Sequence, residues 1–503
     1  MTRRYQNLLE RITPSLTETN KISNIIELMK NTFGNHVNDS YPNSFLRETG
    51  SVGTNTFLKG FSDIDLYFVH EGEIDYNSFS NKMKNLPLDL KDIHVTKSVG
   101  SLKVKFEEKG TEVQVSPISN PFQNITTLRE DAFYHNEFIN SRKKDRFREN
   151  TLLAKEFFKV SGLYPKIKGV SIELLMLEFQ KFEHLLEEIS SGRNIHLDFS
   201  GKYEGNSNSP IRVVYPHTGL ELLNMDITND DFLRLQELSY LVLKDENKFS
   251  ALSHEMRNLT FWENRAEKTH NSEKYSMPDV TLQRKEFNEL IKVVKSLGNS
   301  KRVLDLGCGT GIDLIKLGDI FDCNYFLGID NCSYAIEEAI EKTKGKYNLE
   351  FRLNSATTLD LEKENFDLIY MKRVLSNIAP ENQLNLVSQL RDSLNDNGNL
   401  LIFDYFREPY DKLDGFREKV GLDKLKRPNH NDMLSVDFTS EVEALGFQYK
   451  EINFSSSYFL MTRVILPKLF GNIGYDTNLH QLASIIPNFG NFGVDRAYLF
   501  KKS

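Results

Sequence analysis

Apolar and polar residues follow two periodicities along this chain, one typical of helices and one typical of strands. The two halves of the chain differ in how these periodicities are arranged. In residues 6–34 apolar side chains recur at helical spacing with Pro14 as a break, and residues 146–192 and 229–259 show the same spacing. The segment DIDLYFV, residues 63–69, alternates and is rich in β-branched and aromatic side chains. This pattern predicts a strand. We therefore expect the first half to combine a sheet with several helices.

In the second half, apolar runs such as RVLDLG, YFLGID and GNLLIFD alternate with segments of helical periodicity. This order predicts a parallel sheet with helices on both faces. Residues 260–285 are charged, contain Pro278 and show no periodicity, which predicts an interdomain linker. The expected fold class is a multidomain chain of α/β and α+β parts. Its predicted parts are an α+β domain over 1–140, a helical or α+β domain over 141–259, the linker over 260–285 and an α/β domain over 286–503.

The composition of the chain is that of an acidic globular protein. The 503 residues include 63 Lys and Arg and 71 Asp and Glu, so the formal net charge is −8. A protein that binds nucleic acid over its whole surface would be basic, so any such contact has to be local. Hydrophobic residues make up 39% and charged residues 27%, which argues against a disordered chain.

The N-terminal residues and the cysteine spacing predict a protein of a reducing compartment. The first twenty residues lack the apolar core of a signal peptide, and no run of about 18 apolar residues occurs. Cys308, Cys323 and Cys332 show no C-x-x-C spacing, which argues against a disulfide framework and a structural zinc site. We expect a cytoplasmic protein without a membrane span.

A glycine-rich turn follows the first strand of the second half. The segment VLDLGCGTG places Gly307, Gly309 and Gly311 between an apolar strand and a helix. Glycines at such a turn let the backbone approach a ligand closely at the N-terminus of the helix. Asp330 closes the next strand, where a carboxylate can accept hydrogen bonds from both hydroxyls of a ribose. The turn alone fits Rossmann-type nucleotide-binding domains in general.

Together with the strand FDLIYM and the later turn LNDNGNLLIFD, this motif makes residues 285–503 resemble class I S-adenosylmethionine-dependent methyltransferases. The resemblance implies a Rossmann-like sheet and S-adenosylmethionine as cofactor. It places Asp305 near the amino-acid end of the cofactor and Asp330 at its ribose. Where the family often has an Asp beside the adenine, this chain has Ser355 followed by Ala356, so Ser355 is the candidate there. A nicotinamide-binding Rossmann domain is the alternative.

The methyl acceptor and a catalytic base stay open at this level. His430, Asp404 and Tyr405 are candidate bases, with a structural role as the alternative for each. A small molecule and an RNA 3′ end are both compatible acceptors, and the oligomeric state is not specified by the sequence.

A second motif, GSVGTNTFLKGFSDIDLYFV, covers residues 50–69. Gly50 and Ser51 begin a turn and a helix whose backbone amides can hold a triphosphate. Asp63 and Asp65 alternate on one strand, so both carboxylates leave the same face. Two such carboxylates can hold two Mg²⁺ ions for an in-line displacement at phosphorus. A polar strand without a ligand is the alternative.

This motif resembles the signature of polymerase-β-like nucleotidyltransferases, and residues 30–245 resemble archaeal CCA-adding enzymes, which are related to oligoadenylate synthetases. The resemblance implies a palm of mixed sheet and helices over 1–140, a helical central domain, Mg²⁺, and an NTP substrate, ATP first. By position it assigns Lys155, Tyr164 and His135 to the nucleotide. The tail domain that grips tRNA in the archaeal enzymes has no counterpart here, which argues against CCA addition.

One strand departs from this family's pattern. The family's third strand ends in V-D-V-x-P, whereas this chain reads GTEVQVSP, so Gln114 stands where the third Asp is expected. Gln is neutral and a poorer ligand for Mg²⁺ than a carboxylate. Glu112 lies two residues earlier and therefore on the same face, which makes it the candidate third catalytic acid.

Three hypotheses follow from the two motifs. In the first, the chain is a bifunctional enzyme that transfers a nucleotide to a hydroxyl or phosphate acceptor and also transfers a methyl group. In the second, a methyltransferase carries an inactive nucleotidyltransferase-like module that recognises RNA or a nucleotide, which Gln114 supports. In the third, the chain is a nucleotide-sensing defence or signalling protein.

Overall fold

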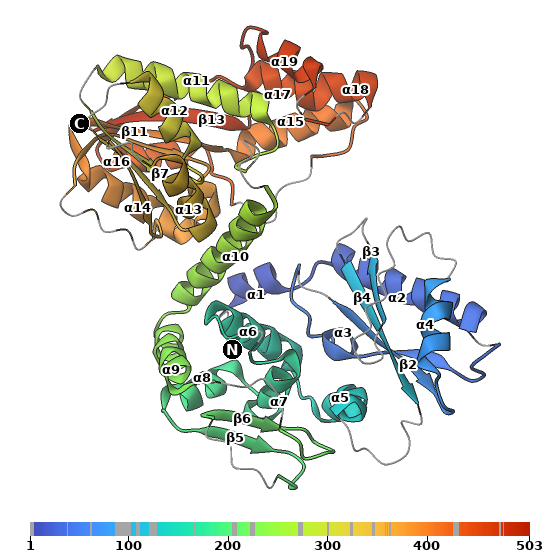
Figure 1. The fold of residues 1–503 in the computed structure, drawn as a ribbon. Coiled ribbons are helices and arrows are strands. Elements are labelled where there is room, and N and C mark those ends of the chain that lie inside the picture. The colour runs from blue at the N-terminus through green and yellow to red at the C-terminus, as the bar shows by residue number, and fades with distance from the viewer. Residues whose placement is uncertain are drawn as a thin grey trace. The chain divides into compact units, whose positions relative to one another are not determined.

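The structure is a computed structural model, and it divides the chain into two compact units, residues 1–253 and 254–503, called here the first and the second unit (Figure 1). The described residues are 5–37, 39–60, 63–85, 102–106, 111–119, 128–164, 166–203, 209–221, 227–269, 275–298, 301–321, 325–344, 348–357, 359, 361, 364–425, 432–471, 474–475 and 477–502.

The first unit contains a mixed four-stranded sheet. Its strands are β1 (Phe45–Glu48), β2 (Ile64–His70), β3 (Leu102–Phe106) and β4 (Thr111–Ser119), in the order β1-β2-β4-β3. Strands β2 and β4 are parallel, and the two outer pairs are antiparallel. The alternation in residues 63–69 therefore predicted β2 correctly. The helices beside this sheet are α2 (Leu16–Val37), α3 (Gly50–Thr54), α4 (Tyr76–Lys84) and α5 (Leu128–Arg142).

One side of this sheet is closed by α2. Its apolar positions, among them Ile22, Met29 and Phe33, form a buried cluster with Leu66 and Phe68 of β2. This is the cluster that the helical spacing of residues 6–34 predicted. The break at Pro14 separates α1 (Gln6–Ile12) from α2.

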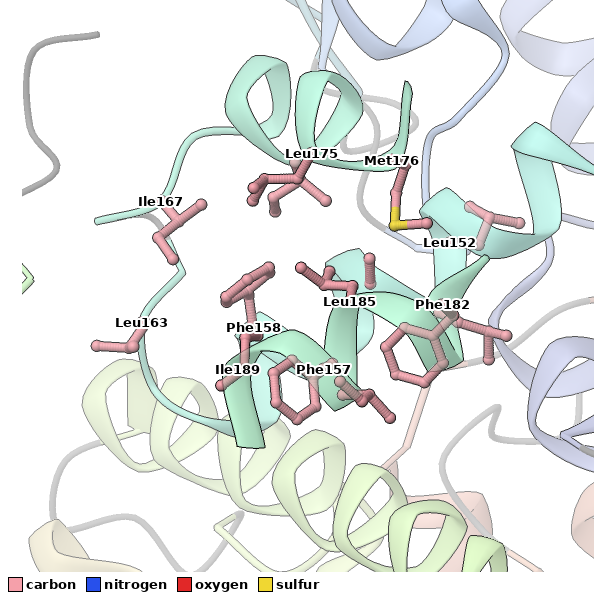
Figure 2. Close-up of a cluster of buried hydrophobic side chains, with 14 of the residues drawn as sticks. Leu152, Phe157, Phe158, Leu163, Ile167, Leu175, Met176, Phe182, Leu185 and Ile189 are labelled. Atoms are coloured by element: carbon pink, nitrogen blue, oxygen red, sulfur yellow. The ribbon is translucent and has the colours of Figure 1, made fainter. Parts of the chain in front are cut away.

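The remainder of the first unit is mainly helical, as predicted. It consists of α6 (Phe147–Val160), α7 (Gly169–Phe179), α8 (Phe182–Ser190), α9 (Asn229–Lys244) and a parallel pair of short strands, β5 (Ile195–Asp198) and β6 (Ile211–Val214). Figure 2 shows its core, in which Phe157, Phe158, Leu175 and Phe182 are buried together. Phe249 stacks on Phe182 with the ring centroids 5.7 Å apart, within the ~4.5–7 Å range typical of aromatic pairs.

The second unit is a three-layer α/β structure around a seven-stranded sheet. The strand order is β12-β13-β11-β10-β7-β8-β9, and β13 is antiparallel to both of its neighbours while β11, β10, β7, β8 and β9 are parallel. The strands are β7 (Arg302–Leu306), β8 (Tyr325–Asp330), β9 (Leu349–Leu353), β10 (Phe366–Lys372), β11 (Leu394–Tyr405), β12 (Phe447–Ile452) and β13 (Asp495–Lys502).

Neighbouring residues of these strands enter two different cores. Val303 belongs to the cluster on one face and Leu304 to the cluster on the other, because side chains alternate along a strand. Both faces are therefore buried, which confirms the predicted parallel sheet with helices on both sides. The main covering helices are α11 (Val280–Leu297), α12 (Ile312–Ile320), α13 (Ser333–Lys342), α14 (Pro380–Asp392), α15 (Arg407–Lys419) and α16 (Phe438–Ala444).

The linker over 260–285 stays a prediction, but much of this range is helical. Helix α10 runs from Glu246 to Thr269, and α11 begins at Val280. Among the residues of α10 that pack within the second unit are His254, Asn258, Trp262 and Ala266, which recur every four positions. Most of these side chains are polar or aromatic, so a search for aliphatic periodicity does not detect this helix. The boundary between the two units, after Ser253, lies inside α10. The predicted boundary near residue 140 stays a prediction.

Candidate functional site

The glycine turn of the second unit connects β7 to α12 and leaves no room for side chains. Gly309 and Gly311 have φ of +53° and +68°, in the left-handed region that favours glycine. A Cβ on Gly309 would lie 2.7 Å from the ring of Tyr275, and a Cβ on Gly311 would lie 2.5 Å from the ring of Phe351. The exposed backbone of the turn, including Gly307, lines a cavity of about 1140 Å³ including its open mouth.

Asp330 at the end of β8 is held by backbone amides beside this turn. The N–H of Gly309 donates to Oδ2 at 2.8 Å, and the N–H of Cys332 donates to Oδ1 at 2.9 Å. Burial raises the pKa of Asp330, although these backbone hydrogen bonds lower it. The geometry fits the role that the sequence assigned to Asp330.

Asp305, the second predicted acid, is buried in the same cavity wall. The Tyr370 hydroxyl donates to its Oδ2 at 2.7 Å. Burial, together with the charge of Asp313, raises the pKa of Asp305 well above its ordinary value. Lys372 Nζ lies 2.7 Å from Asp313 and 2.9 Å from Glu286, so this cation is shared between two acids at the cavity.

Ser355 follows β9 and also lines the cavity, as predicted. Its Oγ accepts a hydrogen bond from the Thr357 N–H at 3.3 Å and lies 3.0 Å from Thr357 Oγ1. All six residues that the sequence assigned to the cofactor, Asp305, Gly307, Gly309, Gly311, Asp330 and Ser355, lie on the loops after β7, β8 and β9 or at their strand ends. Five of them line the cavity, and Gly311 begins α12 beside it.

Two of the three candidate bases are described by the structure, and neither lines the cavity. Asp404 and Tyr405 are not among the described residues that line it, and His430 lies outside the described residues. Asp404 is fully buried, and its Oδ2 accepts a hydrogen bond from the Ser376 N–H at 3.1 Å. Burial raises the pKa of Asp404 to about 6. These contacts favour a structural role for Asp404, which was the alternative to its role as a base.

The sequence missed several lining residues. Glu255, Asn258 and Trp262 come from α10, and Tyr275 precedes α11. All four fall at or inside the ranges predicted to end the helical domain or form the linker. Arg373, which also lines the cavity, is buried and lies 3.6 Å from Asp495. No motif in the sequence marks these residues, because they reach the cavity from three separate elements.

In the first unit, Gly50 brings the start of α3 against β2. Gly50 has a φ of +59°, and a Cβ on it would lie 2.8 Å from Asp65 Oδ2. The Thr49 N–H donates to the backbone oxygen of Asp65 at 2.9 Å. The turn and the acidic strand of the second motif are therefore in direct contact, which a larger residue at position 50 would prevent.

A cavity of about 1520 Å³ including its mouth opens at this contact. It collects all the residues that the sequence assigned to nucleotide and metal except Glu112: Gly50, Ser51, Asp63, Asp65, His135, Lys155 and Tyr164. Burial raises the pKa of the Tyr164 hydroxyl, and Asp63, Glu173 and Asp65 raise it further. Tyr164 is therefore neutral at physiological pH beside the two carboxylates.

Gln114, not Glu112, faces this cavity. In the parallel pairing of β2 with β4, Gln114 lies opposite Asp65 and lines the cavity. The pairing begins at Ile64 and Val113, so Glu112 lies before the first pair and is not among the described lining residues. Glu112 as a replacement for the third carboxylate therefore has no support from the geometry.

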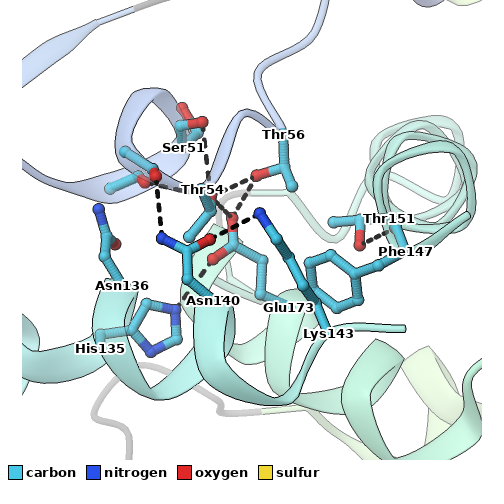
Figure 3. A network of polar contacts seen from close by, with 12 residues as sticks. Ser51, Thr54, Thr56, His135, Asn136, Asn140, Lys143, Phe147, Thr151 and Glu173 are labelled. Atoms are coloured by element: carbon cyan, nitrogen blue, oxygen red, sulfur yellow. Dashed lines mark hydrogen bonds and ion pairs between the residues drawn. The ribbon is translucent and has the colours of Figure 1, made fainter. Parts of the chain in front are cut away.

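Glu173 also lines this cavity and joins the two predicted nucleotide contacts Lys155 and His135. Glu173 lies 2.9 Å from Lys155 Nζ through Oε1 and 2.9 Å from His135 Nε2 through Oε2. Thr54 and Thr56 also donate to Oε1 (Figure 3). Burial alone would raise the pKa of Glu173, but Lys155, His135 and Thr56 outweigh it and lower the pKa. The sequence missed Glu173 because it stands in an apolar helical run, SIELLML.

Two features are absent from the described part of the chain. Within it, no three His, Cys, Asp or Glu side chains gather as a metal site would require. Among its helices, none combines the length and the apolar character needed to cross a membrane.

Comparison with known proteins assigns part of the second unit to a family. Residues 303–398 match the family model of the methyltransferase domain. Phosphoethanolamine N-methyltransferase of Plasmodium falciparum is 32% identical over 127 residues, which are 25% of this chain and 47% of the relative. The CCA-adding enzyme of Methanocaldococcus jannaschii is 28% identical over 171 residues, which are 31% of this chain and 37% of that enzyme. The chain thus spans less than half the length of these two relatives.

Among solved structures, the N-methyltransferase NodS of Bradyrhizobium japonicum is 14% identical, with a TM-score of 0.32 over 49% of this chain and 98% of that chain. The glycine turn, Asp330 and strands β7 to β10 all lie within the residues that the family model matches. The second unit of this chain therefore contains a methyltransferase domain.

Proposed function

We propose that the second unit is an S-adenosylmethionine-dependent methyltransferase. The observation that carries this proposal is the pairing of Asp330 with the glycine turn. Its carboxylate is fixed by the N–H groups of Gly309 and Cys332, and both the acid and the turn line one cavity. The residues fit S-adenosylmethionine, because the glycine turn leaves space for a ligand and Asp330 offers two acceptor oxygens for ribose hydroxyls.

S-adenosylmethionine supplies an electrophilic methyl group when it is bound. Asp330 would hold the ribose, the backbone of Gly307 and Gly309 would face the amino-acid portion, and Asp305 would lie at its amino end. Lys372 and Arg373 line the same cavity, where they set its electrostatic field together with Asp313 and Glu286. The acceptor is a small molecule or an RNA end.

Titration of the full chain with S-adenosylhomocysteine in a calorimeter tests this proposal. We expect saturable binding, and Asp330→Ala should weaken it by about a hundred- to ten-thousandfold, because two hydrogen bonds to a charged group contribute ~3–6 kcal/mol in all. Asp392→Ala, at an exposed position of α14, is the matched control and should leave the affinity unchanged. Absence of binding by a folded wild-type chain would contradict the proposal.

We propose as a second function that the first unit binds an NTP with Mg²⁺ and transfers its nucleotide to a hydroxyl or phosphate acceptor. The supporting observation is the contact of Gly50 with Asp65 in a cavity that also contains Ser51 and Asp63. Asp63 and Asp65 would hold Mg²⁺, and the amides at the start of α3 would face the triphosphate. ATP is the first NTP to test.

Pyrophosphate release from each NTP, with Mg²⁺ and with or without short RNA, tests this second proposal. Release that is lost in Asp63→Ala would support a bifunctional enzyme. Saturable NTP binding without release under any of these conditions would instead support an inactive recognition module or a nucleotide sensor. The control Asp75→Ala changes an acid that is not among the described residues lining the cavity.

A further inference from the structure

The loop after β9 follows Asp330 along the edge of the sheet. The Asn354 N–H donates to the backbone oxygen of Asp330 at 3.0 Å, and residues 354–357 line the cavity next to it. A nucleoside carries its base on the ribose, so a ribose bound by Asp330 would direct its base toward this loop. Ser355 is the residue that the sequence comparison places at the base.

The hydroxyl of Ser355 is already committed to hydrogen bonds within the loop. The Thr357 N–H donates to Ser355 Oγ, and the hydroxyls of Ser355 and Thr357 lie 3.0 Å apart. Thr357 in turn makes a side-chain hydrogen bond to Glu255. A hydroxyl has one hydrogen, so Thr357 donates to the Glu255 carboxylate and Ser355 donates to Thr357. The chain of hydroxyls therefore ends at Glu255.

Glu255 comes from α10 and is held at the cavity by its neighbours on the helix. His254 Nε2 lies 3.1 Å from the backbone oxygen of Asn377, and the Asn258 amide donates to the same oxygen. Glu255 itself lines the cavity and is half-buried there. A carboxylate has about four acceptor positions on its two oxygens, and Thr357 uses one of them.

Resting on the proposed S-adenosylmethionine site, we infer that Glu255 reads the adenine, by accepting a hydrogen bond from its exocyclic amino group. Glu255 thereby supplies, from outside the methyltransferase motif, the carboxylate that the loop after β9 lacks at Ser355. The amino group is a donor only, and a carboxylate is an acceptor only, so the pair discriminates adenine from a base with a carbonyl at that position.

Competition between two ligands tests this inference. S-inosylhomocysteine differs from S-adenosylhomocysteine by a carbonyl in place of the exocyclic amine. We expect the full-length wild-type chain to bind the adenosyl compound about ten- to a hundredfold more tightly in calorimetric titrations, as expected for a hydrogen bond to a charged group. In Glu255→Gln this preference should largely disappear, because the amide can accept from the amine or donate to the carbonyl.

Two variants separate Glu255 from its surroundings. Ser355→Ala should keep the preference of the wild type. Glu263→Gln, on the same helix but not among the described residues that line the cavity, should keep it as well. A preference that survives in Glu255→Gln, or is lost in Ser355→Ala alone, would overturn the assignment.

The two proposals fail in different ways. If the wild type binds both compounds equally, the assignment of Glu255 is overturned while the cofactor site stands. If it binds neither compound, both the cofactor site and the assignment are overturned.

Discussion

The two cavities share a contact between a glycine and an acid, but the two units differ in the groups that hold their buried acids. In each, a glycine with positive φ, Gly50 or Gly309, brings the start of a helix against an acid on a neighbouring strand, Asp65 or Asp330. At the first cavity, the buried acid Glu173 is paired with Lys155 and His135. In the second unit, the acids Asp330 and Asp404 accept hydrogen bonds mainly from backbone N–H groups.

Because their hydrogen-bond partners differ, the pKa of Glu173 shifts in the opposite direction from those of Asp330 and Asp404. Cations and hydroxyl donors outweigh burial at Glu173 and lower its pKa, whereas burial prevails at Asp330 and Asp404 and raises theirs. Burial disfavours a charge unless an opposite charge or several donors compensate. At the first cavity, Lys155 is therefore already paired with Glu173 before any nucleotide binds. The second cavity presents Asp330, which is held by backbone N–H groups and not by a cation.

The largest expected effect comes from breaking the ion cluster. Glu173→Ala leaves the buried Lys155 without its counterion, so the free energy of unfolding should fall by about 3–5 kcal/mol. Urea denaturation, monitored by a probe in the first unit, measures this change. Glu187→Ala, at an exposed position of α8, is the control and should change the free energy by less than about 0.5 kcal/mol. A loss for Glu173→Ala no larger than that of this control would show that Lys155 finds other partners.

The second test uses pH, because the two acids contribute with opposite signs. The pKa of Glu173 is lowered on folding, so its contribution is present above pH ~4.5 and is lost as the pH falls below that value. The pKa of Asp404 rises to about 6, so its contribution is greatest below pH ~4 and is lost as the pH rises to about 6.

For Asp404 this difference amounts to about 3 kcal/mol between pH ~4 and ~6. Denaturation curves of the wild type and of Asp404→Asn over this interval measure it. The variant should lose this pH dependence, while Asp437→Asn, at an N-terminal position of α16, should keep it. Identical pH profiles of wild type and Asp404→Asn would contradict the raised pKa.

The smallest expected effect concerns the third acid of the first cavity. Gln114→Asp places a carboxylate opposite Asp65, where it can bind Mg²⁺ and accept a proton, so pyrophosphate release should rise by at least about tenfold. Initial rates at saturating NTP measure the change. Glu112→Gln, by contrast, should leave the rate unchanged because Glu112 is not among the described residues at the cavity. A loss of activity in Glu112→Gln would restore Glu112 as the third acid.

Local patterns predicted the parts of the sites that are continuous in sequence. The turn of Gly307, Gly309 and Gly311 and the acid Asp330 could be identified because the ends of adjacent parallel strands meet at one edge of a sheet. Asp63 and Asp65 could be identified because they alternate on one strand. Glu112 was the weaker prediction, since alternation gives the face of a strand but not where its pairing with the next strand begins.

Residues from distant segments could not be predicted in the same way. Glu173 stands in an apolar helix of the first unit, and Glu255 stands in α10, near a segment whose charges indicated a linker. Neither belongs to a recognisable motif, because its role depends on which elements pack against its helix.

The sequence by itself determined the alternating α/β order of the second unit, the mixed composition of the first, and the two glycine-and-acid motifs. It could do so because periodicity and turn chemistry act between residues that are near in the chain. Only the tertiary structure decided that Lys155 is neutralised by Glu173, that Gln114 faces Asp65, and that Glu255 reaches the cavity beside Ser355. Charge pairing, strand register and cavity walls join residues that are far apart in sequence, and these are set by how the elements pack.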